Sequence, residues 1–282
     1  ALYLIAFIIT LGAMLVQIKR TGLSSDITND EIMAHIRYLS HENRGGRYPG
    51  TRGSRDVIAY MTKHLKSYGV EPGLEGSYIQ PFDITSGIKL GKGNSAQING
   101  DSIFVEKDYI PLWFSSSGPV QASIVFAGYG FDINEKELQW NDYDGLDVKG
   151  KWVMVMRHSP ERESTHSIFA KHSPLHKKAT VERDRGAIGI IFISQIEDDG
   201  LFPLNYITGY SNTGISALHF SNNRADKILR NVGWSRERIQ KTMNRSLEPV
   251  NFIMKDQVLD VNVNLQLITT RCANVVGKIC LL

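Results

Sequence analysis

The sequence predicts an α/β protein of one or two domains. Short continuous apolar runs, which are typical of buried strands, alternate with helical patterns in the second half of the chain. The 282 residues are 42% hydrophobic and 22% charged. That composition is typical of globular proteins and unlike that of disordered or collagen-like chains.

The charge balance argues against a nucleic-acid partner. The 32 Lys and Arg residues exceed the 29 Asp and Glu residues by three, and the basic residues are dispersed along the chain. A surface that tracks phosphates needs them clustered. Two cysteines in 282 residues also exclude a disulfide scaffold and any Cys-based zinc finger.

The N-terminal segment predicts export or anchoring. Leu2–Ile18 is an uncharged apolar stretch of seventeen residues, followed by Lys19 and Arg20. This length is short for a membrane span and slightly long for the core of a signal peptide. Residues 1–20 are therefore predicted to be a secretory signal or an N-terminal membrane anchor, which implies an extracytoplasmic location.

Two helices are predicted next. The first covers residues 28–39 and begins with a capping-box pair, Thr28 and Glu31. The Gly- and Arg-rich residues 43–53 predict a loop. The second helix follows with an apolar stripe, and Gly69 is placed to end it in a left-handed turn.

Strands and helices then alternate. A strand is expected at residues 79–84, and residues 85–100 indicate a hairpin or linker. Apolar runs predict buried strands at residues 122–127, 152–156, 188–193 and 215–220. Helical patterns predict helices at residues 175–185, 223–232 and 236–244. Alternation over Val258–Leu267 predicts a half-buried strand, and another apolar strand begins at Asn274.

Histidine patterns give no metal site. No H-E-x-x-H, His-x-Asp or adjacent Glu pair occurs. His172 and His176 have the spacing that directs two ligands to one metal from a helix. Pro174 lies between them and disfavours such a helix. The segment from His158 to His176 is therefore expected to be an exposed loop with polar histidines.

The other candidate groups have structural explanations. Gly87–Gly93 lacks the spacing of a phosphate loop and indicates a turn. Cys272 and Cys280 are expected to be buried thiols on two strands. Asp198 and Asp199 are expected to be solvated in a loop. No G-x-S-x-G elbow occurs, so no catalytic, cofactor-binding or metal-binding residue is assigned in this chain.

Two stretches resemble a known family. In the first, the loop Gly46-Arg47-Tyr48-Pro49-Gly50-Thr51-Arg52-Gly53 joins the two predicted helices, and Tyr78-Ile79-Gln80-Pro81-Phe82 follows. This is similar to the start of the secreted zinc-dependent aminopeptidases, the family that includes glutamate carboxypeptidase and the transferrin receptor. The glycines fit tight turns, and Arg47 is expected to hold the loop by ion-pair or carbonyl contacts.

The second stretch, residues 118–221, resembles the protease-associated domain inserted in these enzymes. Its motifs are, in order, Val125-Phe126-Ala127-Gly128-Tyr129-Gly130, the run from Tyr143 to Val153, Arg185-Gly186-Ala187-Ile188-Gly189, and Ile215-Ser216-Ala217-Leu218-His219. Asn274-Val275-Val276-Gly277 then resembles the strand by which such enzymes re-enter the peptidase domain.

The resemblance implies an incomplete start of a zinc-peptidase α/β domain, with an inserted protease-associated domain of β-strands and short helices. The expected divisions are residues 1–20 as signal or anchor, 21–100 as the N-terminal part of the peptidase domain, 101–265 as the protease-associated domain, and 266–282 as the return strand.

The function that the resemblance implies is that of a metallo-aminopeptidase. Its two zinc ions activate a water that hydrolyses the N-terminal residues of peptides. The family's zinc ligands follow the Asn-Val-Val-Gly strand, and this sequence ends at Leu282, before any of them. The chain is therefore expected to be a fragment that binds no zinc by itself.

Two further functions remain open at this stage. One is a non-catalytic receptor that uses the protease-associated domain for binding or sorting, and the other is a membrane-tethered interaction module. Zinc ligands in the coding sequence that follows would favour the enzyme, and their absence would favour a receptor or module.

Overall fold

The computed structural model describes residues 27–162, 164, 166–205 and 212–279. The chain divides into two compact units, and the first is discontinuous: residues 1–84 and 270–282 form it, and residues 85–269 form the second. The predicted signal or anchor, residues 1–20, lies outside the described residues. In the part of the chain that is described, no helix is long and apolar enough to cross a membrane.

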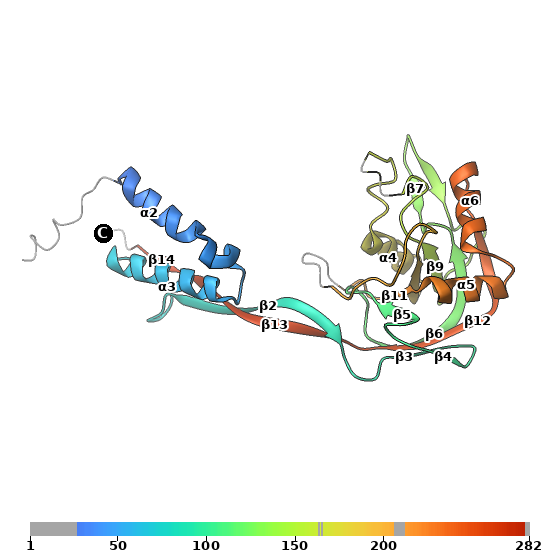
Figure 1. The fold of residues 1–282 in the computed structure, drawn as a ribbon, viewed down its shortest axis with the longest axis horizontal. Coiled ribbons are helices and arrows are strands. Elements are labelled where there is room, and N and C mark those ends of the chain that lie inside the picture. The colour runs from blue at the N-terminus through green and yellow to red at the C-terminus, as the bar shows by residue number, and fades with distance from the viewer. Residues whose placement is uncertain (1–26, 163, 165, 206–211, 280–282) are drawn as a thin grey trace, which may run out of the picture. The chain divides into compact units, whose positions relative to one another are not determined.

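The first unit consists mainly of two helices (Figure 1). Helix α2 spans Asn29–Ser40 and helix α3 spans Arg52–Ser67, with the 3-10 segment η1 between them at Glu42–Arg47. The predicted capping box begins α2. The N–H of Glu31 donates to Oγ1 of Thr28, and the N–H of Thr28 donates to the Glu31 carboxylate.

The contact between α2 and α3 is polar and aromatic. The ring nitrogens of His35 lie 2.7 and 2.9 Å from the hydroxyl oxygens of Tyr60 and Tyr68. No residue of α2 is buried, and Gly53 is the only one buried in α3. Gly69 follows α3 at a φ of 74°, the predicted left-handed turn. The two helices therefore meet without a buried apolar core of their own.

Residues 43–53 are more regular than the loop that the sequence predicts. Segment η1 occupies their first part and α3 begins at Arg52. The loop prediction was wrong at the two ends of this segment, because 3-10 turns form on either side of Gly45 and Gly46 and because Thr51 caps α3 and so begins the helix at Arg52. Gly45 and Gly46 themselves have positive φ and break the helical pattern, as expected of a loop. Arg47 donates from Nη1 to the carbonyl of Leu39 at 2.8 Å, which confirms the predicted carbonyl contact.

A long two-stranded ribbon carries the chain out of the first unit and back. Strand β2 spans Ile79–Leu90 and pairs with β13, Leu265–Val275. Backbone hydrogen bonds from Val276 to Tyr78 and from Gly91 to Asn264 make the pair antiparallel. The short strands β1 (Glu71–Pro72) and β14 (Gly277–Lys278) extend this pairing in a second two-stranded sheet.

Two predictions about this ribbon are wrong. The first half of Gly87–Gly93 continues strand β2 rather than forming a turn. Residues 258–267 belong to two strands, because the chain leaves one sheet for another at Asn264. Its N–H donates to Oδ1 of Asn94 and its carbonyl accepts the N–H of Gly91, so neither group continues the first ladder.

The second unit contains a mixed eight-stranded sheet with the order β4-β3-β12-β6-β9-β10-β11-β5. Strands β6, β9, β10 and β11 are parallel, and the outer strands pair antiparallel on both sides. The strands are β3 (Ser95–Ile98), β4 (Asp101–Ile103), β5 (Tyr109–Pro111), β6 (Gly118–Ala127), β9 (Trp152–Met156), β10 (Gly189–Ile193), β11 (Ser216–Phe220) and β12 (Asn251–Val263). The predicted α/β class and the four buried strands are confirmed. The hairpin or linker expected at residues 85–100 is only partly correct, because residues 85–90 continue β2 and the hairpin of β3 and β4 covers residues 95–103.

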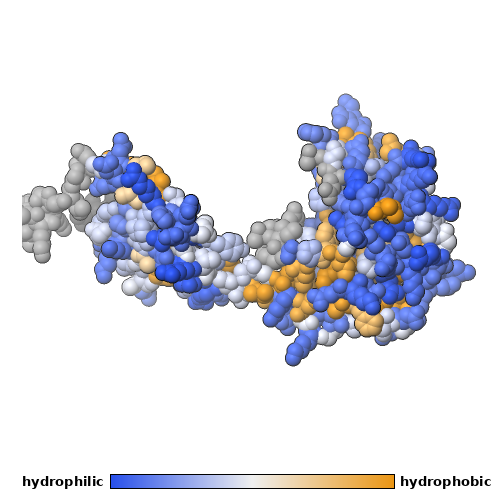
Figure 2. Space-filling view, in the orientation of Figure 1, coloured by the Kyte–Doolittle hydropathy of each residue, from blue (hydrophilic) through white to orange (hydrophobic). Residues whose placement is uncertain are grey.

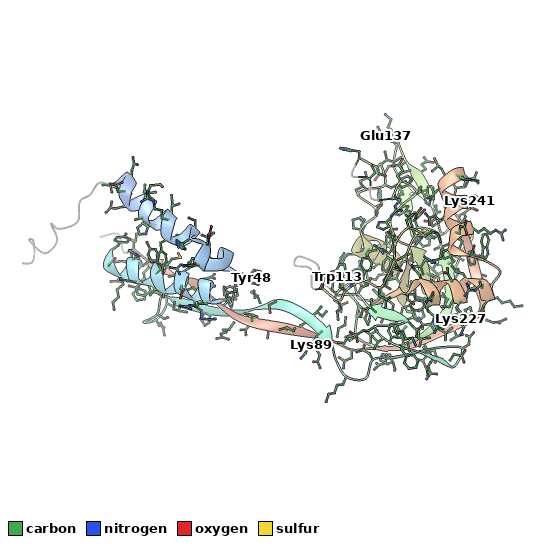
Figure 3. The ribbon with its side chains drawn as sticks, in the orientation of Figure 1. Tyr48, Lys89, Trp113, Glu137, Lys227 and Lys241 are labelled. Atoms are coloured by element: carbon green, nitrogen blue, oxygen red, sulfur yellow. The ribbon has the colours of Figure 1, made fainter. Side chains whose placement is uncertain are left out.

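Helices cover both faces of this sheet. Along β9, Trp152, Met154 and Met156 pack in one core with helices α5 and α6, whereas Val153 and Val155 pack in the other with α4. The helices are α4 (Leu175–Asp184), α5 (Asn222–Asn231) and α6 (Arg236–Ser246), close to their predicted bounds. Lys227 and Lys241 mark the exposed side of α5 and α6 in Figure 3.

A small hairpin stands apart from the large sheet. Strands β7 (Asp132–Asn134) and β8 (Gln139–Asn141) form it, and Glu137 lies in its turn (Figure 3). Ile133 and Trp140 are buried in the α5–α6 core. The hairpin, which lies between β6 and β9 in the sequence, therefore covers part of that core.

Candidate functional site

The histidines do not converge on a metal site. Nε2 of His172 lies 3.2 Å from the Glu135 carboxylate, whereas the ring of His176 meets Phe114 edge-on at 5.5 Å between centroids. Pro174 precedes the first residue of α4, so no helix runs through both histidines, as the sequence predicts. Among the residues that the structure describes, no three His, Cys, Asp or Glu side chains could hold one ion.

The loop from His158 to His176 is less exposed than the sequence predicts. Phe169 is 3% exposed and stacks on Phe131 within the core. Ser159 is fully buried, and its hydroxyl donates to the carbonyl of Arg162. The polarity of the histidines suggested exposure, but Phe169 holds part of this loop against the core.

Asp198 is not the solvated loop residue that the sequence predicts. Its carboxylate accepts from Nη2 of Arg162 at 3.1 Å and lies 3.0 Å from Nε2 of His158 and 3.9 Å from Nη1 of Arg157. The side chain of Asp198 is 15% exposed, and Asp199 alone matches the expectation of exposure. The loop after β10 lies beside the residues that follow β9. These two segments are about forty residues apart in the sequence, so their contact could not be predicted from it.

A cavity of about 410 Å³ opens beside this cluster. Arg157 and His158, which follow the last residue of β9, line one side together with Arg162. The rest of the lining is mostly apolar and includes two serines: Ser164, Ala170, Ser173, Pro174, Leu175 and Phe202. Ligands of α/β folds bind at the carboxyl ends of parallel strands, and this cavity lies at that end of β9.

The backbone is strained at two of the residues that line the cavity, His158 and Arg162. His158 and Arg162 have φ values of 59° and 58°, in a region that side chains with a Cβ rarely adopt. Between them the N–H of Arg162 donates to the carbonyl of Ser159 at 3.0 Å. Such conformations cost roughly 1–3 kcal/mol each and persist where the surroundings enforce them, often at binding sites.

A buried lysine, Lys178, hydrogen-bonds to the backbone beside the cavity. Nζ of Lys178 donates to the carbonyls of Met156 and His158, at 3.0 and 2.6 Å. It also lies 4.5 Å from the centre of the Phe131 ring. Burial lowers the pKa of Lys178 to about 7, because water no longer solvates the ammonium.

Two carboxyl groups are buried near Lys178. Asp142 accepts the N–H groups of Tyr129 and Phe131 at 3.0 and 2.8 Å, and Glu182 accepts the Tyr143 hydroxyl at 2.7 Å. Burial raises the pKa of Asp142 to about 7 and that of Glu182 to about 8. These contacts tie strands and helix together, so we assign all three groups a structural role.

His219 is buried and neutral. Burial lowers its pKa to about 3. Its Nδ1 accepts the N–H of Phe202 at 3.1 Å, so Nε2 carries the proton and donates to Oγ of Ser194 at 3.0 Å. Because neither nitrogen is exposed, the histidine positions Phe202 and Ser194 rather than exchanging protons with a substrate.

Sequence reasoning missed the residues of this cluster for a clear reason. Arg157, Arg162 and Asp198 form no motif, and a tertiary contact between two loops brings them together. One signal was present: Arg157 and His158 directly follow a continuous apolar strand, which is where α/β folds place ligand-binding residues.

Comparison with known proteins gives only distant structural likeness. No family model and no curated protein matches the chain. An aminopeptidase from Aneurinibacillus sp. strain AM-1 has 19% identity and a TM-score of 0.45, over 85% of this chain and 45% of that one. The zinc aminopeptidase BSAP from Bacillus subtilis has 13% identity and a TM-score of 0.37, over 88% and 47%.

A peptidase M28 precursor from Shewanella amazonensis SB2B is similar at 16% identity and a TM-score of 0.35, over 86% of this chain and 51% of that one. The chain thus spans about half the length of these proteins. TM-scores this low do not define a shared fold.

Proposed function

We propose that this chain is the supporting part of a zinc-dependent aminopeptidase, with a protease-associated domain inserted in it. The observation that carries the proposal is the order of the motifs. The Gly-Arg loop, the four motifs of residues 118–221 and the Asn-Val-Val-Gly strand occur in family order. The discontinuous first unit supports it, because the chain leaves that unit after Ile84 and returns at Thr270.

The exposed apolar surface of the first unit also supports the proposal. Figure 2 shows small orange areas on this unit. Several large apolar side chains of the unit are more than a third exposed: Ile32, Met33, Ile36, Met61 and Phe82. Covering the part of each side chain that is still exposed would stabilise the fold by roughly 1 kcal/mol. Amphipathic helices of this kind normally cover a sheet. We propose that further residues of the peptidase domain supply it.

A zinc centre does not fit the described residues themselves, since no three ligand-type side chains meet there. Zinc catalysis needs about three protein ligands at one ion and an open position for water. We therefore assign no catalytic step to these residues. The two zinc ions and the peptide substrates are part of the proposal for the whole enzyme.

The proposal is tested by extending the chain. The coding DNA after the Leu282 codon is read in all three frames, and any open extension is expressed with the chain. We expect a His-x-Asp, a Glu-Glu pair and chelator-sensitive release of N-terminal residues from aminoacyl chromogenic substrates. An extension without these ligand motifs, or activity that a chelator leaves unchanged, would contradict the proposal.

A second candidate is a binding or sorting receptor built on the same inserted domain. The cavity beside Arg162 favours it, because a binding module needs a pocket and no catalytic group. The extended chain distinguishes the two functions. A receptor would lack zinc ligands and turnover and would still bind its cargo.

We also propose that the chain is exported or anchored through Leu2–Ile18. The absence of charge over this segment supports the proposal. A periplasmic or secreted reporter fused after Leu282 should be active, and replacing Leu4 and Ile8 by Asp should abolish export. A reporter that stays soluble and active in the cytosol would contradict this.

A further inference from the structure

The cavity of the second unit combines a cationic side with apolar walls. Arg157, His158 and Arg162 line one part of it, and Leu175 and Phe202 belong to the apolar part. A volume of about 410 Å³ lies in the usual range for small-ligand pockets. The cavity lies outside the residues invoked for peptidase activity, so an inference about it is independent of that function.

Arg162 has donors to spare for a ligand. Its guanidinium carries five N–H donors. Nη1 contacts Oε2 of Glu197 and Nη2 contacts Oδ1 of Asp198, both at 3.1 Å. The side chain is 39% exposed, and the two contacts fix the plane of the guanidinium at the cavity. A fixed guanidinium with unused donors is a bidentate site for a carboxylate.

The surrounding charges disfavour a ligand with two negative charges. Asp198 pairs with Arg157 and Arg162, Glu197 pairs with Arg162, and neither acid is part of the cavity lining. These two carboxylates balance the charges of the two guanidinium groups, so a doubly charged phosphate is poorly balanced here. Helix α4 begins at the cavity with Leu175, and the positive end of its dipole adds a weak preference for an anion.

We propose that this cavity binds a monocarboxylate that carries an apolar group, such as the C-terminal end of a peptide with an aliphatic last residue. The carboxylate contacts the guanidinium of Arg162. The aliphatic group lies against Ala170, Pro174, Leu175 and Phe202. A free aliphatic acid has the same chemistry, and the experiment distinguishes the two sources.

The test is a ligand-observed NMR titration of the full 282-residue chain. The probes are N-acetyl-L-leucine, N-acetyl-L-leucinamide, 4-methylpentanoate and inorganic phosphate. We expect N-acetyl-L-leucine to bind with a dissociation constant on the order of 1 mM or below. The amide should bind at least about tenfold more weakly, because it lacks the charge that Arg162 recognises. Tighter binding of the acetylated amino acid than of 4-methylpentanoate assigns a peptide end, and the reverse assigns a free acid.

Three variants separate recognition from folding. Arg162→Gln should weaken N-acetyl-L-leucine about tenfold or more, whereas Arg230→Gln, on the exposed end of α5, should leave it unchanged. Ala170→Trp should fill the cavity and abolish binding while retaining its charges. Circular dichroism and melting curves verify that each variant folds.

The proposal is overturned if the amide binds as well as the acid, or if phosphate binds more tightly. It is equally overturned if neither acid binds, or if folded Arg162→Gln binds like the unaltered chain. If Arg162→Gln does not fold, the Ala170→Trp result decides alone.

Discussion

Glu182 should make the stability of the second unit depend on pH. The folded protein holds its proton up to about pH 8, whereas an ordinary glutamate releases it near 4.5. Between these values the folded state binds more protons than the unfolded chain, so stability falls as the pH rises. Glu182→Gln keeps the contact with Tyr143 but has no proton to lose. The stability of the unaltered chain relative to this variant should fall by more than about 1 kcal/mol between about pH 5 and about pH 7.

Urea unfolding at the two pH values measures this difference. Asp142, whose pKa is also raised, contributes equally to both proteins and cancels. The titration of Lys178 affects stability mainly above this window. Burial lowers its pKa from 10.5 to about 7, so between these two pH values the unfolded chain binds more protons and stability rises with pH. Glu137→Gln, in the exposed hairpin turn, is the matched control. A constant difference across the window would show that Glu182 is ionised in the folded state.

A side chain at Gly128 should clash with a neighbouring residue, whereas a side chain at Gly145 should not. A Cβ at Gly128 would lie 2.0 Å from Oδ1 of the buried Asp142, in addition to a φ of 42°. Gly145 has a φ of 68° but nothing within 4 Å of such a Cβ. Gly145→Ala should therefore lose about 1–2 kcal/mol from backbone strain alone, and Gly128→Ala about 2 kcal/mol more. Equal losses in urea unfolding would show that Asp142 moves freely.

At the scale of the element, the capping box should decide how firmly α2 begins. Thr28→Ala removes the acceptor for the N–H of Glu31 and should lose about 1 kcal/mol of local stability. Glu31→Gln keeps an acceptor for the N–H of Thr28 and should be nearly neutral. Amide hydrogen exchange over residues 29–34 measures both. Faster exchange in Glu31→Gln than in Thr28→Ala would contradict the account.

The central strands of the second unit could be predicted because almost every residue in them is buried and apolar. Each central strand is buried on both faces, so a continuous apolar run identifies it, as in Trp152–Met156. Gly189, at the start of β10, is required because a Cβ would lie 2.3 Å from the Trp152 ring. The ribbon was harder, because alternation continues through Asn264 while the pairing partner changes from β6 to β2.

The candidate site could not be predicted in the same way. Asp198 lies in a loop that contains no motif, and its partners His158 and Arg162 lie about forty residues earlier in the sequence. Charged residues in loops are usually solvated, so sequence reasoning assigned Asp198 to solvent. Lys178 is a similar case, since burial of a lysine depends on two backbone carbonyls that only the folded loop supplies.

At the scale of the whole molecule, the two units should differ in resistance to proteases. The second unit has two apolar cores, one on each face of its sheet, whereas α2 and α3 bury almost nothing. Limited trypsin digestion should therefore leave a fragment with ends near Thr85 and Thr269. Mass spectrometry identifies these ends. Early cleavage within β9 or β10, or survival of α2 and α3 as long as the rest, would contradict the division.

We propose that these residues support a zinc peptidase without holding its zinc. The most direct measurement is the zinc content of the purified 282-residue chain after dialysis against zinc, combined with an assay on aminoacyl chromogenic substrates. We expect less than stoichiometric zinc and no turnover, because no three ligand-type side chains meet in the described part of the chain. One tightly bound zinc per chain, or turnover that a chelator abolishes, would contradict it.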